Sequence, residues 1–179
     1  TIIAIMFAPL LAKKFGKKNV CIAGFVLMVG NSFLCYIVQP TDIGLLLGLT
    51  ITGSLFYGPT IPLVWAIFAD VVDYGEWKTG RRATGMVFAT IGFGLKAGLA
   101  FGGAALSWVE SAVGYDPDNA SPQIIQAFRA CDTIVPGVLF AICAGLFFLY
   151  KLDKKATLRI SAELAERRKA TDAGAPAVA

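Results

Sequence analysis

Histidine is absent from the 179-residue sequence, and charged residues make up only 16% of it. Without histidine the common metal sites lose a usual ligand. The four cysteines lie in or beside apolar stretches and form no CxxC pair, so we interpret them as packing residues and expect no metal site. An initiating methionine and a signal-peptide pattern are also lacking, and we interpret the sequence as a fragment.

Hydrophobic residues make up 56% of the sequence, and the mean hydropathy is +0.68. Soluble domains contain about a quarter charged residues, and a chain of this length could not hide so much apolar surface from water. The composition therefore predicts a membrane protein whose surrounding partner is the lipid bilayer. We expect no nucleic-acid partner.

Long apolar stretches predict several membrane-spanning helices. A helix needs about 20 mostly apolar residues to cross roughly 30 Å of hydrocarbon. Four stretches meet or nearly meet that length: 20–38, 43–69, 83–113 and 133–150. Residues 1–12 are too few for a whole span, so we expect them to end one. The fold class expected for residues 1–150 is therefore an all-α, polytopic transmembrane helix bundle.

The basic residues indicate the orientation of the bundle. Fourteen of the 16 lysines and arginines lie in loops 13–18 and 70–82 or in the tail after residue 150. Successive crossings bring these three segments to one side of the membrane, and short basic loops mark the cytoplasmic side. In that tail, apolar residues recur every four positions, which predicts a cytoplasmic amphipathic helix over 151–170. We expect residues 171–179 to be disordered.

Two features predict departures from plain spans. Pro59 and Pro62 lie within the 43–69 stretch, and proline removes a backbone donor and kinks a helix. The kink could serve packing alone or a substrate pathway. Gly94, Gly98 and Gly102 follow one another at four-residue spacing, which favours close approach of another helix.

Lys96 is a solitary charge within an apolar stretch. It lies 13 residues past Ala83, or about 20 Å along the helix, which is too deep for its side chain to reach the cytoplasmic surface comfortably. An ionisable residue facing lipid costs at least about 3 kcal/mol. We therefore expect Lys96 to face a carboxylate that fixes helix position or, as a functional residue, a polar pathway.

The block from Asp70 to Arg82 holds three acids and three bases between apolar stretches. It could be a solvated loop, or the aspartates and arginines could pair across the mouth of a pathway as a two-state gate. The spacing of Asp70 and Asp73 also fits a metal-dependent membrane phosphotransferase, but that chemistry needs more acidic ligands, and the next acid after Glu76 is Glu110. A non-transporting membrane scaffold is a further alternative.

Residues 69–83 (ADVVDYGEWKTGRRA), with PLVWA at 62–66 and Lys96, resemble the glycoside-pentoside-hexuronide:cation symporters. This family is the melibiose-permease branch of the major facilitator superfamily. Within it, the sequence of these residues is most similar to that of the xyloside and glucuronide permeases. The resemblance implies the last four to five spans of a twelve-span fold. It also implies a non-enzymatic secondary transporter of the inner membrane, moving a sugar or glycoside with Na⁺ or H⁺ by alternating access.

The resemblance also implies residue roles. Asp70, Asp73 and Arg82 would belong to the cytoplasmic gate, and Lys96 would line the central cavity. No cofactor is implied, and the ligands of the co-transported cation would lie in an N-terminal six-helix bundle missing from this sequence. Thr84 stands where many relatives carry glutamate, and Ile61 stands where melibiose permease carries tryptophan. Carriers of a lipid or a sulfonated sugar in the same superfamily are the alternative.

Overall fold

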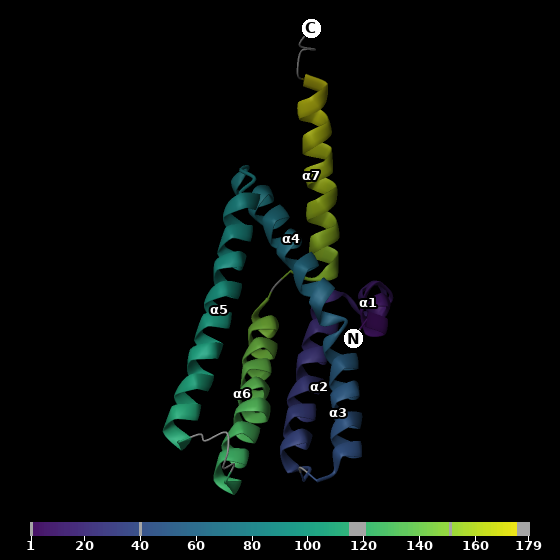
Figure 1. Cartoon of the computed structure of the whole chain (residues 1–179). Coiled ribbons are helices and arrows are strands. Elements are labelled where there is room, and N and C mark those ends of the chain that lie inside the picture. Colours follow the sequence, from purple (N-terminus) through teal and green to yellow (C-terminus); the bar gives the residue numbers. More distant parts are fainter. Residues whose placement is uncertain (1, 40, 115–120, 151, 175–179) are drawn as a thin grey trace.

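The computed structural model describes residues 2–39, 41–114, 121–150 and 152–174, which form seven helices and no strand (Figure 1). The helices are α1 (Ile2–Phe15), α2 (Lys17–Ile37), α3 (Ile43–Tyr57), α4 (Thr60–Thr79), α5 (Thr84–Val113), α6 (Pro122–Leu149) and α7 (Lys154–Gly174). Four segments are long and apolar enough to cross a membrane: 17–37, 43–79, 84–113 and 124–149. The prediction of an all-α bundle of membrane-spanning helices is confirmed.

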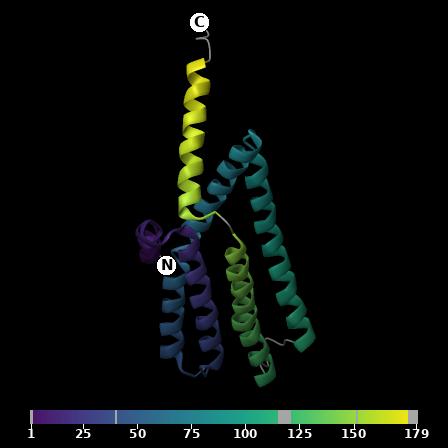
Figure 2. The ribbon, with the colours of Figure 1, turned by 180° about the vertical axis from the view of Figure 1, so that it is seen from behind.

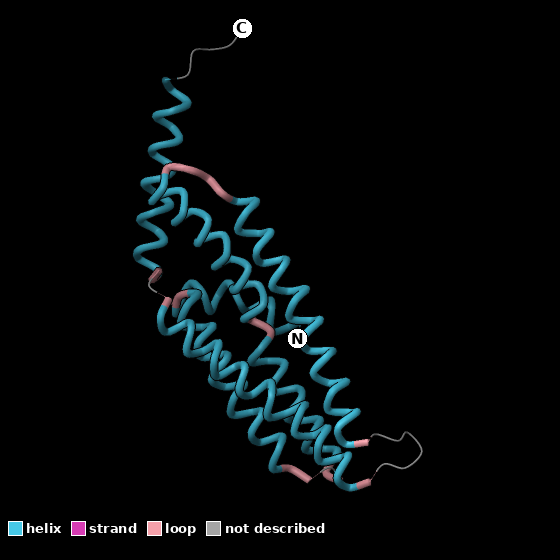
Figure 3. The backbone as a smooth tube through the Cα atoms, turned by 90° about the vertical axis from the view of Figure 1, so that its left-hand side faces the viewer, coloured by secondary structure: helices cyan, strands magenta, loops and turns pink. Residues whose placement is uncertain are grey.

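Helix α2 lies at the centre of the bundle, where it packs against α1, α3, α4 and α6 (Figures 1 and 2). The core joins small side chains to larger ones, and the ring of Phe25 lies 6.0 Å from that of Phe140 and 5.5 Å from that of Phe147. Small residues such as Ala8, Cys21 and Ala144 let the helix backbones come close. The side view shows the long helices running in similar directions (Figure 3).

The connections are shorter than the sequence predicted. Only Gly16 separates α1 from α2, where a loop over 13–18 was expected. Gly16 adopts a φ of 84°, a left-handed conformation that glycine takes without a steric penalty, and this allows the abrupt change of direction. Helix α4 likewise continues through most of the charged block as far as Thr79.

Helices α6 and α7 also differ from their expected bounds. Helix α6 begins eleven residues before the expected position 133, because Ser121 caps its amino end by accepting a hydrogen bond from Ile124 N at 3.4 Å and Pro122 suits the first turn. In α7, Ile160 and Leu164 are buried where the helix packs against α4. Helix α7 includes residues 171–174 of the tail expected to be disordered, and 175–179 lie outside the described residues.

Helix α5 stands apart from the other helices over much of its length (Figure 1). None of its residues is buried within the described part of the chain. Cβ atoms added at Gly94, Gly98 and Gly102 would meet no described atom within 4 Å, so the expected close approach does not occur at this ladder. Close approach occurs instead at Gly24, whose added Cβ would lie 2.5 Å from Thr60 Cγ2, and at Gly53.

Replacement of Gly24 by alanine is expected to lower stability, because the new methyl group would also lie 3.1 Å from the Phe56 carbonyl oxygen. The Thr60 side chain is fully buried and has little room to move. Overpacking of this kind costs about 1 to 3 kcal/mol. Thermal unfolding of the complete protein in detergent should show a clearly lower midpoint. Gly30→Ala on the same helix is the control, because no described atom lies within 4 Å of its added Cβ; equal effects of the two variants would contradict the packing.

Candidate functional site

The carboxyl-terminal part of α4 carries three carboxylates, Asp70, Asp73 and Glu76, spaced three residues apart. This spacing places them along one side of the helix. The helix continues past Glu76 until Gly80, whose φ of 71° ends it and whose N–H donates to the Glu76 carbonyl at 2.8 Å. The row of acids therefore stands on a rigid element and not on a loop.

Asp70 forms an ion pair with Lys17, the first residue of α2. Lys17 Nζ donates to Asp70 Oδ1 at 2.8 Å and to Oδ2 at 2.7 Å. The Asp70 side chain is 13% exposed and that of Lys17 37%. The pair fixes the junction between α1 and α2 against α4.

The hydroxyl of Tyr150 lies near this pair at the end of α6. Burial, and to a smaller extent the negative charge of Asp70, raise the pKa of Tyr150 to about 12. The hydroxyl therefore stays protonated well into the alkaline range. Among the described residues it is buried without a hydrogen-bond partner. The ion pair with Lys17 is therefore the contact that neutralises Asp70.

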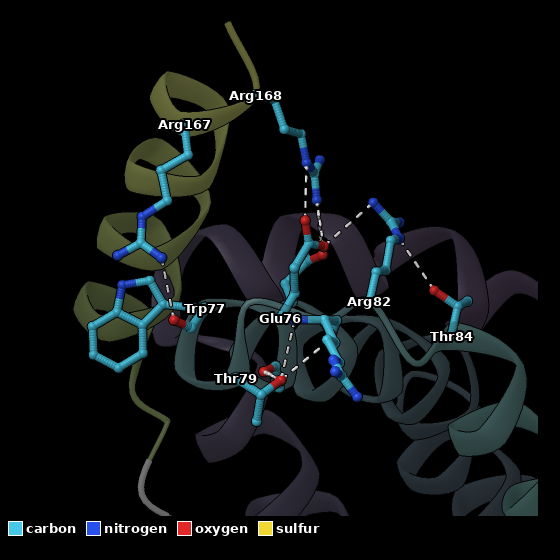
Figure 4. A network of polar contacts seen from close by, with 10 residues as sticks. Glu76, Trp77, Thr79, Arg82, Thr84, Arg167 and Arg168 are labelled. Atoms are coloured by element: carbon cyan, nitrogen blue, oxygen red, sulfur yellow. Dashed lines mark hydrogen bonds and ion pairs between the residues drawn. The ribbon is translucent and has the colours of Figure 1, made fainter. Parts of the chain in front are cut away.

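Glu76 lies between two arginines (Figure 4). Arg168 of α7 donates from Nη2 to Glu76 Oε2 at 2.8 Å, and Arg82 Nη1 lies 3.6 Å from the same oxygen. Arg168 also reaches Asp73, with 3.9 Å between Nη2 and Oδ1. The hydrogen bond with Glu76 is the main reason why the pKa of Arg168 is raised. Glu76 thus joins α7 to the connection between α4 and α5.

A second set of contacts holds α7 beside α4. Trp77 Nε1 donates to Glu163 Oε2 at 2.7 Å, and Arg159 Nε donates to Glu163 Oε1 at 2.7 Å. Arg167 Nη1 donates to the Trp77 carbonyl at 3.3 Å, as Figure 4 shows. The hydrogen bonds from Trp77 and then Arg159 lower the pKa of Glu163, because they favour the charged carboxylate.

The structure brings Asp70, Asp73 and Arg82 to the same end of α4, but Arg82 pairs with Glu76 and not with either aspartate. Arg82 Nε also donates to Thr84 Oγ1 at 3.1 Å. Sequence reasoning did not identify Glu76, Lys17 or Arg168 as members of the cluster. Glu76 continues the three-residue spacing of the aspartates, and that signal could have found it.

The hypothesis of a metal-dependent enzyme gains no support from these contacts. Asp70 and Asp73 face the basic groups of Lys17 and Arg168. Within the described residues, no group of three Cys, Asp or Glu side chains is placed to hold a metal ion. The carboxylates therefore have the surroundings of ion-pair partners.

Lys96 lies on the middle of α5 and is exposed. The described residues supply no ion-pair partner for its ammonium group. Its neighbours on the helix are mostly apolar, and Phe93 and Leu99 are largely exposed as well. The structure thus leaves a single cation on an otherwise apolar helix face.

The span that contains Pro59 and Pro62 is interrupted between α3 and α4 at Gly58 and Pro59. Both prolines lie at the start of α4, where a helix needs no backbone N–H. Thr60 Oγ1 donates to the Tyr57 carbonyl at 2.7 Å and so satisfies an acceptor at the break. A cavity of about 280 Å³ beside it is lined by residues of α2, α3 and α6, including Asn31 and Asp132.

Four long apolar helical segments, one of them broken and leading into a cluster of ion pairs, indicate a polytopic membrane protein. Residues 1–154 match the family model described as MFS/sugar transport protein. The chain belongs to the glycoside-pentoside-hexuronide:cation symporter family of the major facilitator superfamily. No solved structure matches the chain.

Three relatives illustrate the family. The chain is 36% identical to the isoprimeverose transporter of Lactiplantibacillus pentosus, over 86% of this chain and 32% of that protein. It is 34% identical to YagG of Escherichia coli K12, whose name proposes a glycoside/cation symporter, over 81% of this chain and 32% of that protein. It is 33% identical to a Salmonella typhimurium protein whose name proposes a sulfoquinovose importer, over 94% of this chain and 36% of that protein. The chain spans about a third of the length of these relatives.

Reversal of the charge at Lys17 is expected to destabilise the protein, because Lys17→Glu places two carboxylates together. Adding Asp70→Lys should restore the attraction. Since Lys17 is partly exposed, the coupling between the two positions should be about 1 kcal/mol. Thermal unfolding of the single and double variants measures it. Lys14→Glu is the control for charge alone, and a double variant no better than the sum of its singles would argue against the pair.

The attachment of α7 should weaken when the indole donor is lost. Trp77→Phe keeps an aromatic ring beside Tyr74, with which Trp77 now stacks, but removes the hydrogen bond to Glu163. Backbone amides of α7 should then exchange hydrogen several times faster, as measured by mass spectrometry. Trp108→Phe on α5 provides the control. Unchanged exchange in Trp77→Phe would show that this bond does not hold α7.

The same attachment should depend on acidic pH. The pKa of Glu163 is lowered from an ordinary value of 4.5, so its stabilising effect is complete above that value and is lost as the pH falls through the lowered pKa. Hydrogen exchange of α7, corrected for the intrinsic effect of pH, should accelerate in that range. In Glu163→Gln the acceleration should be smaller, and an identical pH profile would contradict the assignment.

Proposed function

We propose that this chain forms part of a secondary transporter that moves a sugar or glycoside together with Na⁺ or H⁺ by alternating access. The ion-pair cluster on α4 carries the proposal, because it lies at one end of a broken membrane span in a sugar-transport family. The relative named as an isoprimeverose transporter supports a sugar-containing substrate. A further six-helix bundle would supply the rest of the pathway and the ligands of the cation.

Asp70, Asp73 and Arg82, with Glu76, form the cytoplasmic gate in this proposal. An exposed ion pair contributes about 1 kcal/mol or less, so a few such pairs can hold a closed state that thermal motion still opens. Arg82 and Arg168 are each about half exposed, and both lie near the same carboxylate oxygen of Glu76. Opening would separate Arg82 from Glu76 when the end of α5 moves relative to α4.

The orientation proposed for the chain places this cluster in the cytoplasm. The junction at 13–18, the block at 70–82 and α7 are linked by the contacts of Lys17, Glu76 and Trp77. These segments also hold most of the lysines and arginines, which favour the cytoplasmic side. The protein would then lie in the inner membrane with α7 beneath its bundle.

Lys96 lines the transport cavity in this proposal. An ammonium group on an apolar helix is costly in lipid, and no described residue neutralises it. A polar pathway would provide the hydrated environment that this group needs. The break beside Pro59 and Pro62 supports a pathway along the neighbouring span, because freed backbone groups in a membrane need protein or water around them.

An anionic substrate is a second candidate, favoured by the same lysine. A sulfonated sugar would supply the negative charge that Lys96 lacks among the described residues. The relative whose name proposes a sulfoquinovose importer supports this alternative. Comparison of uptake of neutral glycosides with that of their carboxylated or sulfonated analogues would separate the two candidates.

Lys96→Met is expected to reduce cation-driven uptake at least about tenfold, because loss of a charged group that contacts the substrate in the proposed pathway would cost more than about 1.4 kcal/mol. Uptake of radiolabelled glycosides into vesicles holding the complete protein measures it. Lys96→Arg keeps the charge and should retain part of the activity. Lys78→Met, an exposed lysine at the end of α4, is the matched control.

Equal uptake by Lys96→Met and Lys78→Met, at equal protein levels, would overturn the role of Lys96. Absence of any dependence on a Na⁺ or H⁺ gradient would overturn symport while leaving the family assignment intact. Loss of binding in Lys96→Met only for anionic sugars would favour the second candidate.

A further inference from the structure

A pocket of about 800 Å³ lies where the junction of α1 and α2 meets the end of α6 and the start of α7. It is separate from the cluster around Glu76, although Asp70 forms part of its wall. Five lysines line it: Lys13, Lys17, Lys18, Lys154 and Lys155. Two aspartates, Asp70 and Asp153, oppose them. The pocket therefore carries an excess of positive charge.

Some of these lysines are already engaged. Lys17 pairs with Asp70, Lys18 donates to the carbonyl of Tyr150, and Lys154 Nζ donates to the Lys13 carbonyl at 2.6 Å. Among the described residues, the ammonium groups of Lys13 and Lys155 have no hydrogen-bond or ion-pair partner in the structure. The bonds of Lys18 and Lys154 hold the walls together and leave these two cations available to an anion.

The walls of the pocket are also apolar. Phe15 and Leu158 are largely exposed beside the lysines, and Leu152 also lines the pocket. The adjoining surface of α1 exposes Phe7 and Leu10. A continuous surface of this kind suits a molecule with a negative head and apolar chains.

We propose that this pocket binds the headgroup of an anionic phospholipid of the cytoplasmic leaflet, with its acyl chains lying along α1. Basic pockets between membrane helices at the cytoplasmic side suit such headgroups, and each lysine near an anionic surface contributes about 1 kcal/mol. The lysines lie directly beside the ends of spans, where headgroups are found. The pocket is far larger than an inorganic phosphate ion, and its exposed apolar wall favours a lipid over a free anion.

Binding of dioleoyl phosphatidylglycerol to the complete protein in detergent tests the proposal, with native mass spectrometry as the readout. Lys13→Gln combined with Lys155→Gln should weaken binding about fivefold for each lysine removed. Lys78→Gln combined with Lys169→Gln removes the same charge from exposed positions outside the pocket and should leave binding unchanged. Lys13→Arg with Lys155→Arg keeps the charge and should retain binding, and an unchanged thermal unfolding midpoint of the glutamine variant shows that it folds.

Three outcomes would overturn the proposal. The control pair could lose as much binding as the pocket pair, which would indicate a general charge effect. Dioleoyl phosphatidylcholine could bind as tightly as phosphatidylglycerol. Inorganic phosphate could displace the lipid at similar concentrations, which would indicate a site for free anions. The readout does not involve transport, so its failure and a failure of the proposed symport are distinguishable.

Discussion

The pairing of the carboxylates of α4 with basic residues of distant segments organises this structure. Helix α4 begins directly after the break at Gly58 and Pro59. Its carboxyl-terminal half carries a row of carboxylates, each of which has basic neighbours. Lys17 fixes the junction of α1 and α2 on one side of that row, and Arg168 fixes α7 farther along it. Gly16 and Gly80, where the backbone turns with a positive φ, adjoin these charges.

Glu76 couples two parts of the molecule because two arginines share its carboxylate. If the gate opens by separating Arg82 from Glu76, Arg168 keeps the carboxylate neutralised during the movement. The free energy of opening is then lower than for an isolated pair, which would leave the largely buried Glu76 carboxylate unpaired. A tail helix attached in this way would stabilise the open state of the proposed gate as well as its closed state.

Hydropathy was sufficient to predict the helices, because 20 apolar residues in a row have few alternatives in lipid. It could not predict their ends. Helix α4 continues to Thr79 since charged residues form helices well outside the membrane, and α6 begins at Pro122 because of a local cap that hydropathy does not detect. The partners of Asp70 and Glu76 lie 53 and 92 residues away, so a pattern within one block could identify the acids but not the bases that face them.

Helix α5 has surfaces for which the described residues supply neither a packing partner nor a counter-charge. Its glycines at 94, 98 and 102 offer a smooth surface, its large apolar side chains are exposed, and Lys96 has no charge opposite it among the described residues. Lipid would satisfy the apolar side chains but not the lysine, and a packed helix would use the glycines. A helix that presents all three features needs different neighbours on different faces, which is what the boundary between a helix bundle and a polar pathway provides.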